Sequence, residues 1–438
     1  MSELSAQLAD ALPQGPAGSP DWITDLRNDG AQQFRAHGLP SRKDEAWKYT
    51  GLGQLGQRET HLATAGLSTG VTPALPVPVV AVEQQITMLD GQLLGVPNGL
   101  PDGVTVLSLN EALERGVSGL RSLLESLPAS KQKEMSADGF TALNTATLGT
   151  GVVIHVSGGV DAGRLLMTWS TLNEDIARLF NSRICVMLEP AAKLELLEQF
   201  ETPHMNANTS NVVLQVELGA GATLQHVRLQ QESEETTLVT RTEVLQQAGS
   251  SYSYYGFDLG GGLVRHDLHT SLSGEGAETG INGAYLLDKK RHVDNHSRVD
   301  HLAKGGVSEQ YFRGVAGGSG RAVFNTAVCV HPGADETEAL QSNANILLST
   351  RAEVDTKPEL EIYADEVVAS HGATVGQLDE QAVFYLRTRG LSEEQARQIL
   401  TTAFCRSVSD KLATGAFADG ELAEAISQRM MDVMPQPD

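Results

Sequence analysis

The chain has 438 residues and a formal net charge of −23, with 32 Lys and Arg against 55 Asp and Glu. Nucleic acids and anionic membranes attract basic protein faces, so this charge argues against a general affinity for either. Glycine is frequent, at 44 residues, whereas aromatic residues make up only 5% of the chain. This composition favours many turns over a few thick helices.

The sequence also restricts the compartment. It contains no uninterrupted apolar run of about 18 residues, so no membrane span is expected. The N-terminus carries Glu3 and Asp10 without a basic segment, which argues against a secretory signal. Cys185, Cys329 and Cys405 are too few and too far apart for a disulfide scaffold or a CxxC metal motif. These features predict a cytoplasmic protein.

Residues 1–148 are predicted to form an N-terminal region of helices with some short strands. An amphipathic helix is expected after Pro20, with Gly38 as its stop signal. The dipeptide Asp90-Gly91 lies between two β-type runs and predicts a hairpin. Leucines at helical spacing predict further helix within 108–135.

Residues 149–381 are dominated by short strand-like runs separated by Gly, Asn or Asp. A small residue followed by an alternating run recurs at intervals of roughly 30 residues, with one longer interval between Ala277 and Gly320. These positions are Ala192, Ala222, Ser250, Ala277, Gly320 and Ala352. Such a repeat predicts a solenoid, best matched by a parallel β-helix. A β-sandwich remains the alternative.

Residues 382–438 are predicted to be helical. Ser392 and Gln395 have the spacing of a capping box at the start of a helix. An apolar stripe with a spacing of four follows in that helix, and a second helix is expected over 421–434. The stripe consists of Leu400, Phe404, Val408 and Leu412.

Histidines are concentrated in the second half of the chain. His266 and His269 precede a denser group with interleaved carboxylates, and such spacings are compatible with a divalent metal. A strand would place Cys329 and His331 on one face, where they could form a metal-binding pair. Hydrogen bonding at strand edges explains these residues equally well. The metal candidates are His292, His296, His301, Cys329 and His331.

Long segments of the sequence resemble a known family. These segments are GLPSRKDEAWKYT near the N-terminus, then QSNANILLS, EVDTKPELEIYADEV and SHGATVGQLDEQAVFYLRTRG. They resemble the SufB/SufD family of SUF iron–sulfur cluster assembly proteins, on its SufD side, over nearly the whole chain. The resemblance implies a right-handed parallel β-helix flanked by N- and C-terminal helical regions. It also implies a non-enzymatic scaffold with a role in iron acquisition.

The resemblance further implies partners and cofactors. A SufB-like subunit would form a heterodimer with this chain, and two copies of a SufC-like ATPase would complete the complex. The ATPase would dock on the C-terminal helices and bring the only ATP. The helix expected to dock it is the one with the apolar stripe of Leu400, Phe404, Val408 and Leu412. A transient Fe–S cluster or iron would be shared with the SufB-like subunit, and reduced flavin is associated with some complexes of the family. In isolation, the chain could form a homodimer.

His371 matches the functional histidine of the family and is the main candidate ligand for iron or a cluster at the partner interface. Gly372 follows it where the SufB pattern has a glutamate, and Ala369 stands where many SufD sequences have a cysteine. The other ligands would therefore come from the partner. The alternative function is a β-helix enzyme, either metal-dependent or carbohydrate-active. The low aromatic content argues against the carbohydrate-active form.

Overall fold

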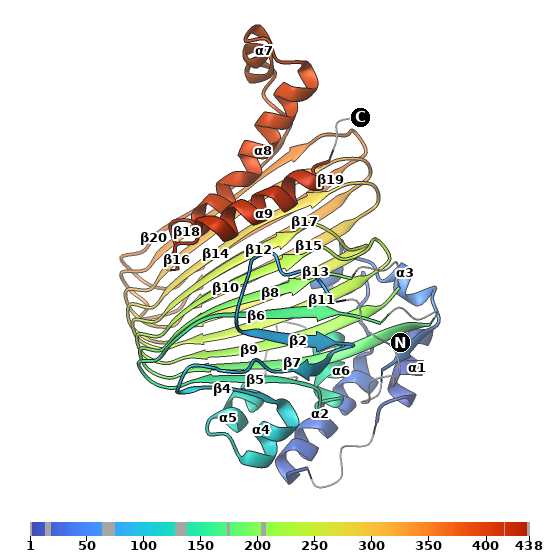
Figure 1. Ribbon diagram of the computed structural model, residues 1–438, viewed down its shortest axis with the longest axis vertical. Coiled ribbons are helices and arrows are strands. Elements are labelled where there is room, and N and C mark those ends of the chain that lie inside the picture. Colours follow the sequence, from blue (N-terminus) through green and yellow to red (C-terminus); the bar gives the residue numbers. More distant parts are fainter. Residues whose placement is uncertain are drawn as a thin grey trace.

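The structure is a computed structural model that describes residues 2–13, 19–63, 75–127, 138–172, 176–202, 207–415 and 417–435. Most of this chain forms a β-solenoid of about 7 turns, with N-terminal and C-terminal helices packed around it (Figure 1). The predicted fold, a mainly-β chain with a parallel β-helix core between helical regions, is confirmed. The β-sandwich alternative is wrong, because successive strands alternate between two parallel sheets.

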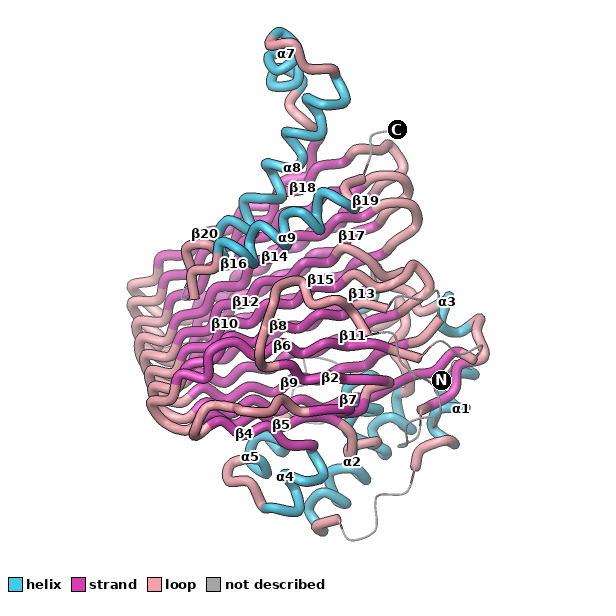
Figure 2. The backbone as a smooth tube through the Cα atoms, in the orientation of Figure 1, coloured by secondary structure: helices cyan, strands magenta, loops and turns pink. Residues whose placement is uncertain are grey.

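Each turn of the solenoid contributes one strand to each of the two sheets, as the tube in Figure 2 shows. Sheet 1 contains β1 (Thr60–Leu62), β4 (Val104–Ser108), β5 (Gly151–Val156), β7 (Ala177–Leu188), β9 (Thr209–Leu218), β11 (Thr237–Gln246), β13 (Leu263–Leu272), β15 (His292–His301), β17 (Arg321–Val330) and β19 (Glu353–Ile362). Sheet 2 contains β2 (Gln85–Leu89), β3 (Gln92–Gly95), β6 (Asp161–Ser170), β8 (Lys193–Phe200), β10 (Thr223–Gln230), β12 (Ser251–Asp258), β14 (Glu278–Leu287), β16 (Val307–Ala316), β18 (Glu338–Leu347) and β20 (Val368–Gly376).

The sequence repeat corresponds to the starts of these strands. Ala192, Ala222, Ser250 and Ala277 precede strands of sheet 2, whereas Gly320 and Ala352 precede strands of sheet 1. The interval between Ala277 and Gly320 is longer because Ala277 precedes a strand of sheet 2, whereas Gly320 precedes a strand of sheet 1. Ala192, Ala222 and Ala277 are fully buried, because each lies at a corner where the chain turns inward against the core.

Alternate residues of each strand face the interior, as expected from the two-residue period of a β-strand. In β15, Val293 and Val299 belong to the main core cluster. Asn295 and Ser297 lie between them on the same face and are also buried. The interior is therefore partly polar, and its polar side chains need hydrogen-bond partners inside the solenoid.

The N-terminal region packs against the first turns of the solenoid and also reaches β13 and β15. Arg265 on β13 donates a hydrogen bond to the carbonyl oxygen of Ala46, and the hydroxyl of Thr50 donates one to Asp294 on β15. Its helices are α1 (Glu3–Asp10), α2 (Asp21–His37), η1 (Glu45–Trp47), α3 (Gly53–Gly56), α4 (Leu109–Arg115), α5 (Leu120–Glu125) and α6 (Gly139–Ala146). Strands β1, β2 and β4 from this region pair directly with solenoid strands. The boundaries 1–148, 149–381 and 382–438 stay predictions.

Three local predictions for this region can be compared with the structure. The helix after Pro20 is confirmed as α2, and Gly38 follows it with a φ of 69°. The hairpin is confirmed between β2 and β3, where Asp90 and Gly91 have φ of 50° and 76°. Helix is found within 108–135, but Gly116 in the left-handed conformation separates α4 from α5. Residues 128–137 lie outside the described residues.

In the part of the chain that the structure describes, three helices follow the solenoid, namely α7 (Glu380–Thr388), α8 (Glu393–Leu412) and α9 (Gly420–Asp432). The capping box of Ser392 and Gln395 is confirmed at the start of α8. Helices α8 and α9 lie along sheet 2, whereas α7 extends past the last turn of the solenoid (Figure 1). Among the described residues, no helix is both long and apolar enough to cross a membrane.

Candidate functional site

His371 lies on β20, the last strand of sheet 2. Its Cα is in register with that of Gln341 on β18, whose side chain points into the solenoid and is 5% exposed. Neighbouring strands in register place paired residues on the same face of a sheet. His371 is therefore on the interior-facing side of β20, yet it is exposed to solvent because no further turn among the described residues covers it.

We call the end formed by β19 and β20 the open end of the solenoid. Both are terminal strands of their sheets, so each has one unpaired edge within the described chain. Four large apolar side chains are exposed there, on or beside these strands. They are Ile362, Tyr363, Val368 and Val375. Unpaired backbone groups next to apolar side chains are the features through which an edge strand pairs with another chain.

Hydrogen-bonded side chains fill the interior beneath His371. The hydroxyls of Ser297 and Thr326 both donate to Oε1 of Gln310, each over 2.5 Å. Gln341 in turn donates from Nε2 to Thr326 Oγ1 over 3.3 Å. This network fixes Gln341, the residue in register with His371, by contacts inside the solenoid.

The histidines around β15 do not converge on one centre. His292 and His296 lie on the outer face on either side of Asp294, and His296 Nε2 is 2.9 Å from Asp294 Oδ1. His301 has the opposite parity and points inward, where its Nε2 is 2.8 Å from the hydroxyl of Ser308. Burial lowers the pKa of His301 to about 4, so it is neutral at physiological pH.

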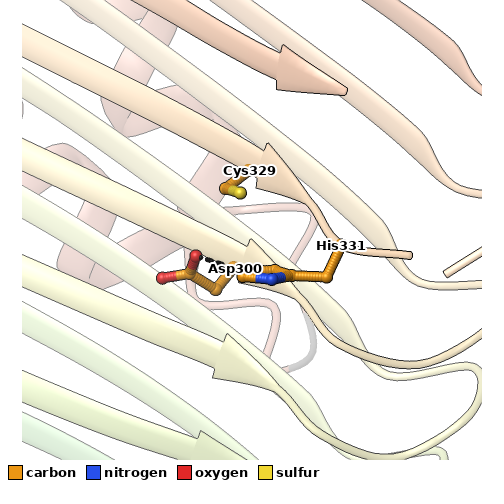
Figure 3. Close-up of side chains that lie close together, drawn as sticks. All are labelled: Asp300, Cys329 and His331. Atoms are coloured by element: carbon orange, nitrogen blue, oxygen red, sulfur yellow. Dashed lines mark hydrogen bonds and ion pairs between the residues drawn. The ribbon is translucent and has the colours of Figure 1, made fainter. Parts of the chain in front are cut away.

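Cys329 and His331 are brought together on the outer face of sheet 1, and Asp300 joins them (Figure 3). Asp300 on β15 is in register with Cys329 on β17. His331 directly follows β17, and its Nε2 is 2.8 Å from Asp300 Oδ1. Burial, reinforced by the neighbouring carboxylate of Asp300, raises the pKa of the Cys329 thiol to about 11.

Asp300 is held in place by two further side chains. Arg298 donates to both of its oxygens, with both distances 2.9 Å. His269 lies between Asp300 and Glu243, with Nε2 2.5 Å from Asp300 Oδ2 and Nδ1 2.8 Å from Glu243 Oε2. Although burial opposes protonation, the two carboxylates raise the pKa of His269 to about 9, so its imidazole is charged.

A cavity of about 260 Å³ lies beside His269, between Trp47 of η1 and the outer face of sheet 1. Its charged lining residues are mostly ion-paired on their own strands. The pairs are Arg241 with Glu243, Arg265 with Asp267, Arg298 with Asp300, and Lys357 with Glu359. The lining offers no surplus of positive charge for a phosphate group, and the association with reduced flavin stays a prediction.

The apolar stripe of α8 packs mainly on the solenoid. Val408 and Leu412 are fully buried against sheet 2, and Leu400 and Phe404 are partly buried in the same cluster. A separate set of apolar side chains is exposed further along the C-terminal helices, where α7 extends past the solenoid. This set, which the sequence analysis did not single out, consists of Phe384, Tyr385 and Ile399.

Comparisons with known proteins agree with this architecture. The family described as SUF system FeS cluster assembly, SufBD core domain, matches residues 170–404, and the SufBD protein N-terminal region matches residues 16–166. The chain is 28% identical to the iron-sulfur cluster assembly protein SufD of Escherichia coli, over 91% of each chain. It is also 28% identical to an iron-sulfur cluster assembly SufBD family protein of Synechocystis, over 98% of this chain and 95% of that protein. The chloroplastic protein ABCI7 of Arabidopsis thaliana is 28% identical over 95% of this chain and 88% of its own length. The chain belongs to the SufBD family of SUF-system iron–sulfur cluster assembly proteins.

Proposed function

We propose that this chain is a scaffold subunit that builds a nascent Fe–S cluster together with a SufB-like partner bound at the open end of the solenoid. The observation that carries this proposal is the position of His371. It is a solvent-exposed histidine on the last, edge-unpaired strand of the solenoid. A ligand in this position can be shared with a second chain that pairs along the same edge.

The chemistry of His371 supports a role as an iron ligand and in iron acquisition. A neutral imidazole is a good ligand for iron, whereas a cluster needs several ligands and is usually held by thiolates. Ala369, two residues before His371, provides no thiol. A Cβ at the neighbouring Gly372 would meet no atom within 4 Å, so there is room for ligands from the partner. Thiolate and carboxylate groups of the partner would complete the site.

The same edge also supports a homodimer of the chain when it is isolated from its partner. Without the SufB-like partner, the exposed apolar side chains and backbone groups of β19 and β20 remain available. A second copy of this chain presents the same unpaired edge and can cover it. We therefore propose a homodimer in isolation that is replaced by the heterodimer when the partner is present.

A SufC-like ATPase is proposed to bind the C-terminal helices, with ATP reaching the complex only through that subunit. Because the stripe of α8 is used to pack on sheet 2, the contact would involve the exposed apolar residues Phe384, Tyr385 and Ile399. The free, buried state of Cys185, Cys329 and Cys405 supports a reducing compartment. We place the complex in the cytoplasm.

The test is to coexpress the chain with its SufB-like and SufC-like partners and to compare wild type with His371→Ala. Iron and sulfide per complex are measured after reconstitution, and subunit retention is measured by affinity purification. His37→Ala serves as the matched control, because His37 is also exposed but lies at the end of α2.

An intact His371→Ala complex with reduced iron and sulfide supports the ligand role. An intact complex with unchanged cluster content contradicts it. If the alanine variant loses its partner, His371→Gln restores the size and hydrogen bonding of the side chain without an imidazole ligand. Recovery of the complex together with full cluster content in that variant would also contradict the ligand role.

A further inference from the structure

The outer face of sheet 1 carries a group of side chains that the scaffold function does not use. Asp300, Cys329 and His331 offer a carboxylate oxygen, a thiol sulfur and an imidazole nitrogen, all within 4.8 Å of one another (Figure 3). We propose that these three residues form a binding site for a borderline divalent cation such as Zn²⁺. Sulfur, nitrogen and oxygen donors in combination are typical of protein sites for that class of cation.

The backbone determines this grouping. Asp300 and Cys329 are paired in register on adjacent parallel strands, so their side chains leave the sheet next to each other. His331 is two residues after Cys329 and lies on the same side. Two ligands bonded to one zinc ion at about 2.0–2.3 Å are at most roughly 4.6 Å apart. The three donor atoms therefore need only small side-chain movements to surround a cation.

A fourth ligand is available on the next strand. Glu361 of β19 is in register with Cys329, so its side chain leaves the sheet on the same face as the thiol. Glu361 is exposed, so its carboxylate can turn towards a cation without losing a buried contact. With Glu361 included, the site has the four ligands of a closed tetrahedral zinc centre.

The surroundings orient the carboxylate ligand. Arg298 binds both oxygens of Asp300, and His269, itself held by Glu243, binds Oδ2. Outer contacts of this kind fix a ligand's orientation and are a regular feature of metal sites. A carboxylate has about four lone-pair positions. Of the contacts that Asp300 makes, only the one between its Oδ1 and His331 Nε2 has to be replaced, by a bond from Oδ1 to the cation.

The site is accessible, and three of its four ligands lie on β15 or on and directly after β17, whereas Glu361 lies on β19 at the open end. The side chain of His331 is 37% exposed, which provides an entry path, whereas Cys329 is 2% exposed and protected from solvent. His371 lies on sheet 2 and faces the interior side, while this group lies on the outer face of sheet 1. All four proposed ligands belong to this chain, so cation binding can be measured without a partner subunit.

Cobalt(II) provides a direct test with the purified, reduced full-length chain and no partner. A cobalt ion bound by a thiolate gives a charge-transfer absorption in the near ultraviolet, which reports Cys329 directly. The expected result is one cobalt per chain with this absorption, and displacement of the cobalt by added Zn²⁺. Cys329→Ala should abolish the absorption. His331→Ala should weaken cobalt binding by at least about tenfold, since losing an outer contact alone costs about 10–100-fold.

Two controls match the chemistry of the site. His155 is paired with Glu189 on an outer face at 3.2 Å without a cysteine, so His155→Ala should leave cobalt binding unchanged. Cys405→Ala removes a buried thiol of α8 and should also leave the absorption unchanged. The proposal is overturned if the wild-type chain shows no thiolate absorption, or if Cys329→Ala retains it. Because His331 is at the surface, unchanged affinity in a folded His331→Ala chain would overturn it as well.

Discussion

Arg228 on β10 and Asp258 on β12 form an ion pair inside the solenoid, with Nη2 and Oδ1 2.7 Å apart and side-chain exposures of 1% and 2%. They are 30 residues apart in the sequence, on neighbouring strands of one sheet. Arg228 also donates from Nε to the hydroxyl of Tyr254, and Asp258 accepts from Asn295. The pair thus connects successive turns of the solenoid through a polar interior.

Removing one member of this pair leaves a buried charge without its counterion. We expect Asp258→Ala to lower the free energy of unfolding by about 3–5 kcal/mol, measured by urea denaturation. The double variant Arg228→Met/Asp258→Leu should be less destabilised than Asp258→Ala, because no buried charge remains unpaired. A double variant that is the less stable of the two would contradict this explanation.

Glycine at position 283 makes room for an aromatic ring of the next turn. A Cβ there would lie 2.2 Å from Cε1 of Phe312, whereas a Cβ at Gly280 on the same strand would meet nothing closer than 3.6 Å. We expect Gly283→Ala to destabilise the chain by about 1–3 kcal/mol and to lower its melting temperature. Gly280→Ala is the matched control and should have no destabilising effect. Equal melting temperatures for the two variants would contradict the overpacking argument.

Glu232 predicts a specific dependence of stability on pH. Burial raises the pKa of its carboxyl from 4.5 to about 7, although the hydroxyl of Thr202 donates to its Oε1 over 3.3 Å and opposes the shift. The unfolded chain ionises first, so stability falls as pH rises from about 4.5 to about 7, by up to about 3 kcal/mol. Glu232→Gln should remove this dependence. The measurement is the unfolding free energy of wild type and variant at about pH 5 and about pH 8. Raising the pH should lower this free energy more for the wild type than for the variant.

The exposed edge at the open end should determine partner binding. Val368 is 64% exposed on β20, and Val368→Lys places a charge where a second chain would pack. We expect the lysine variant to retain its melting temperature but to lose retention of the SufB-like subunit in affinity purification. Val77→Lys, at another highly exposed valine, is the control and should retain it. Full retention by Val368→Lys would place the partner elsewhere.

The exposed residues of α7 should determine ATPase binding. Phe384 is 67% exposed, so Phe384→Asp should leave the melting temperature unchanged and release the SufC-like ATPase from the complex. Val408→Ala, in contrast, removes methyl groups from a fully buried position and should cost stability by about 1–3 kcal/mol. A folded Phe384→Asp chain that still retains the ATPase would exclude this surface.

The sequence predicted the fold class and several local features. Alternating strands with small-residue punctuation indicated the β-helix, and the resemblance around SHGATVGQLDE led to His371 on the last strand. Caps and turns such as Ser392, Gly38 and Asp90-Gly91 were also predicted correctly. These features depend on backbone preferences and periodicities within a few residues, which the local sequence contains in full.

Only the tertiary structure decided which of these residues meet. The two-residue period of a strand already placed Cys329 and His331 on one face, but Asp300 joins them only through the register of β15 with β17. That register depends on the length of each corner between strands, and a shift of one residue would turn every side chain to the other face. The spacing of five residues places His301 on the face of β15 opposite to His296, but only the structure shows that the face of His301 is the interior. The stripe of α8 likewise became a packing surface only when sheet 2 was placed beneath it. Local periodicity determines which way a side chain points along its own strand or helix, whereas contacts between turns depend on distant parts of the chain being brought into register.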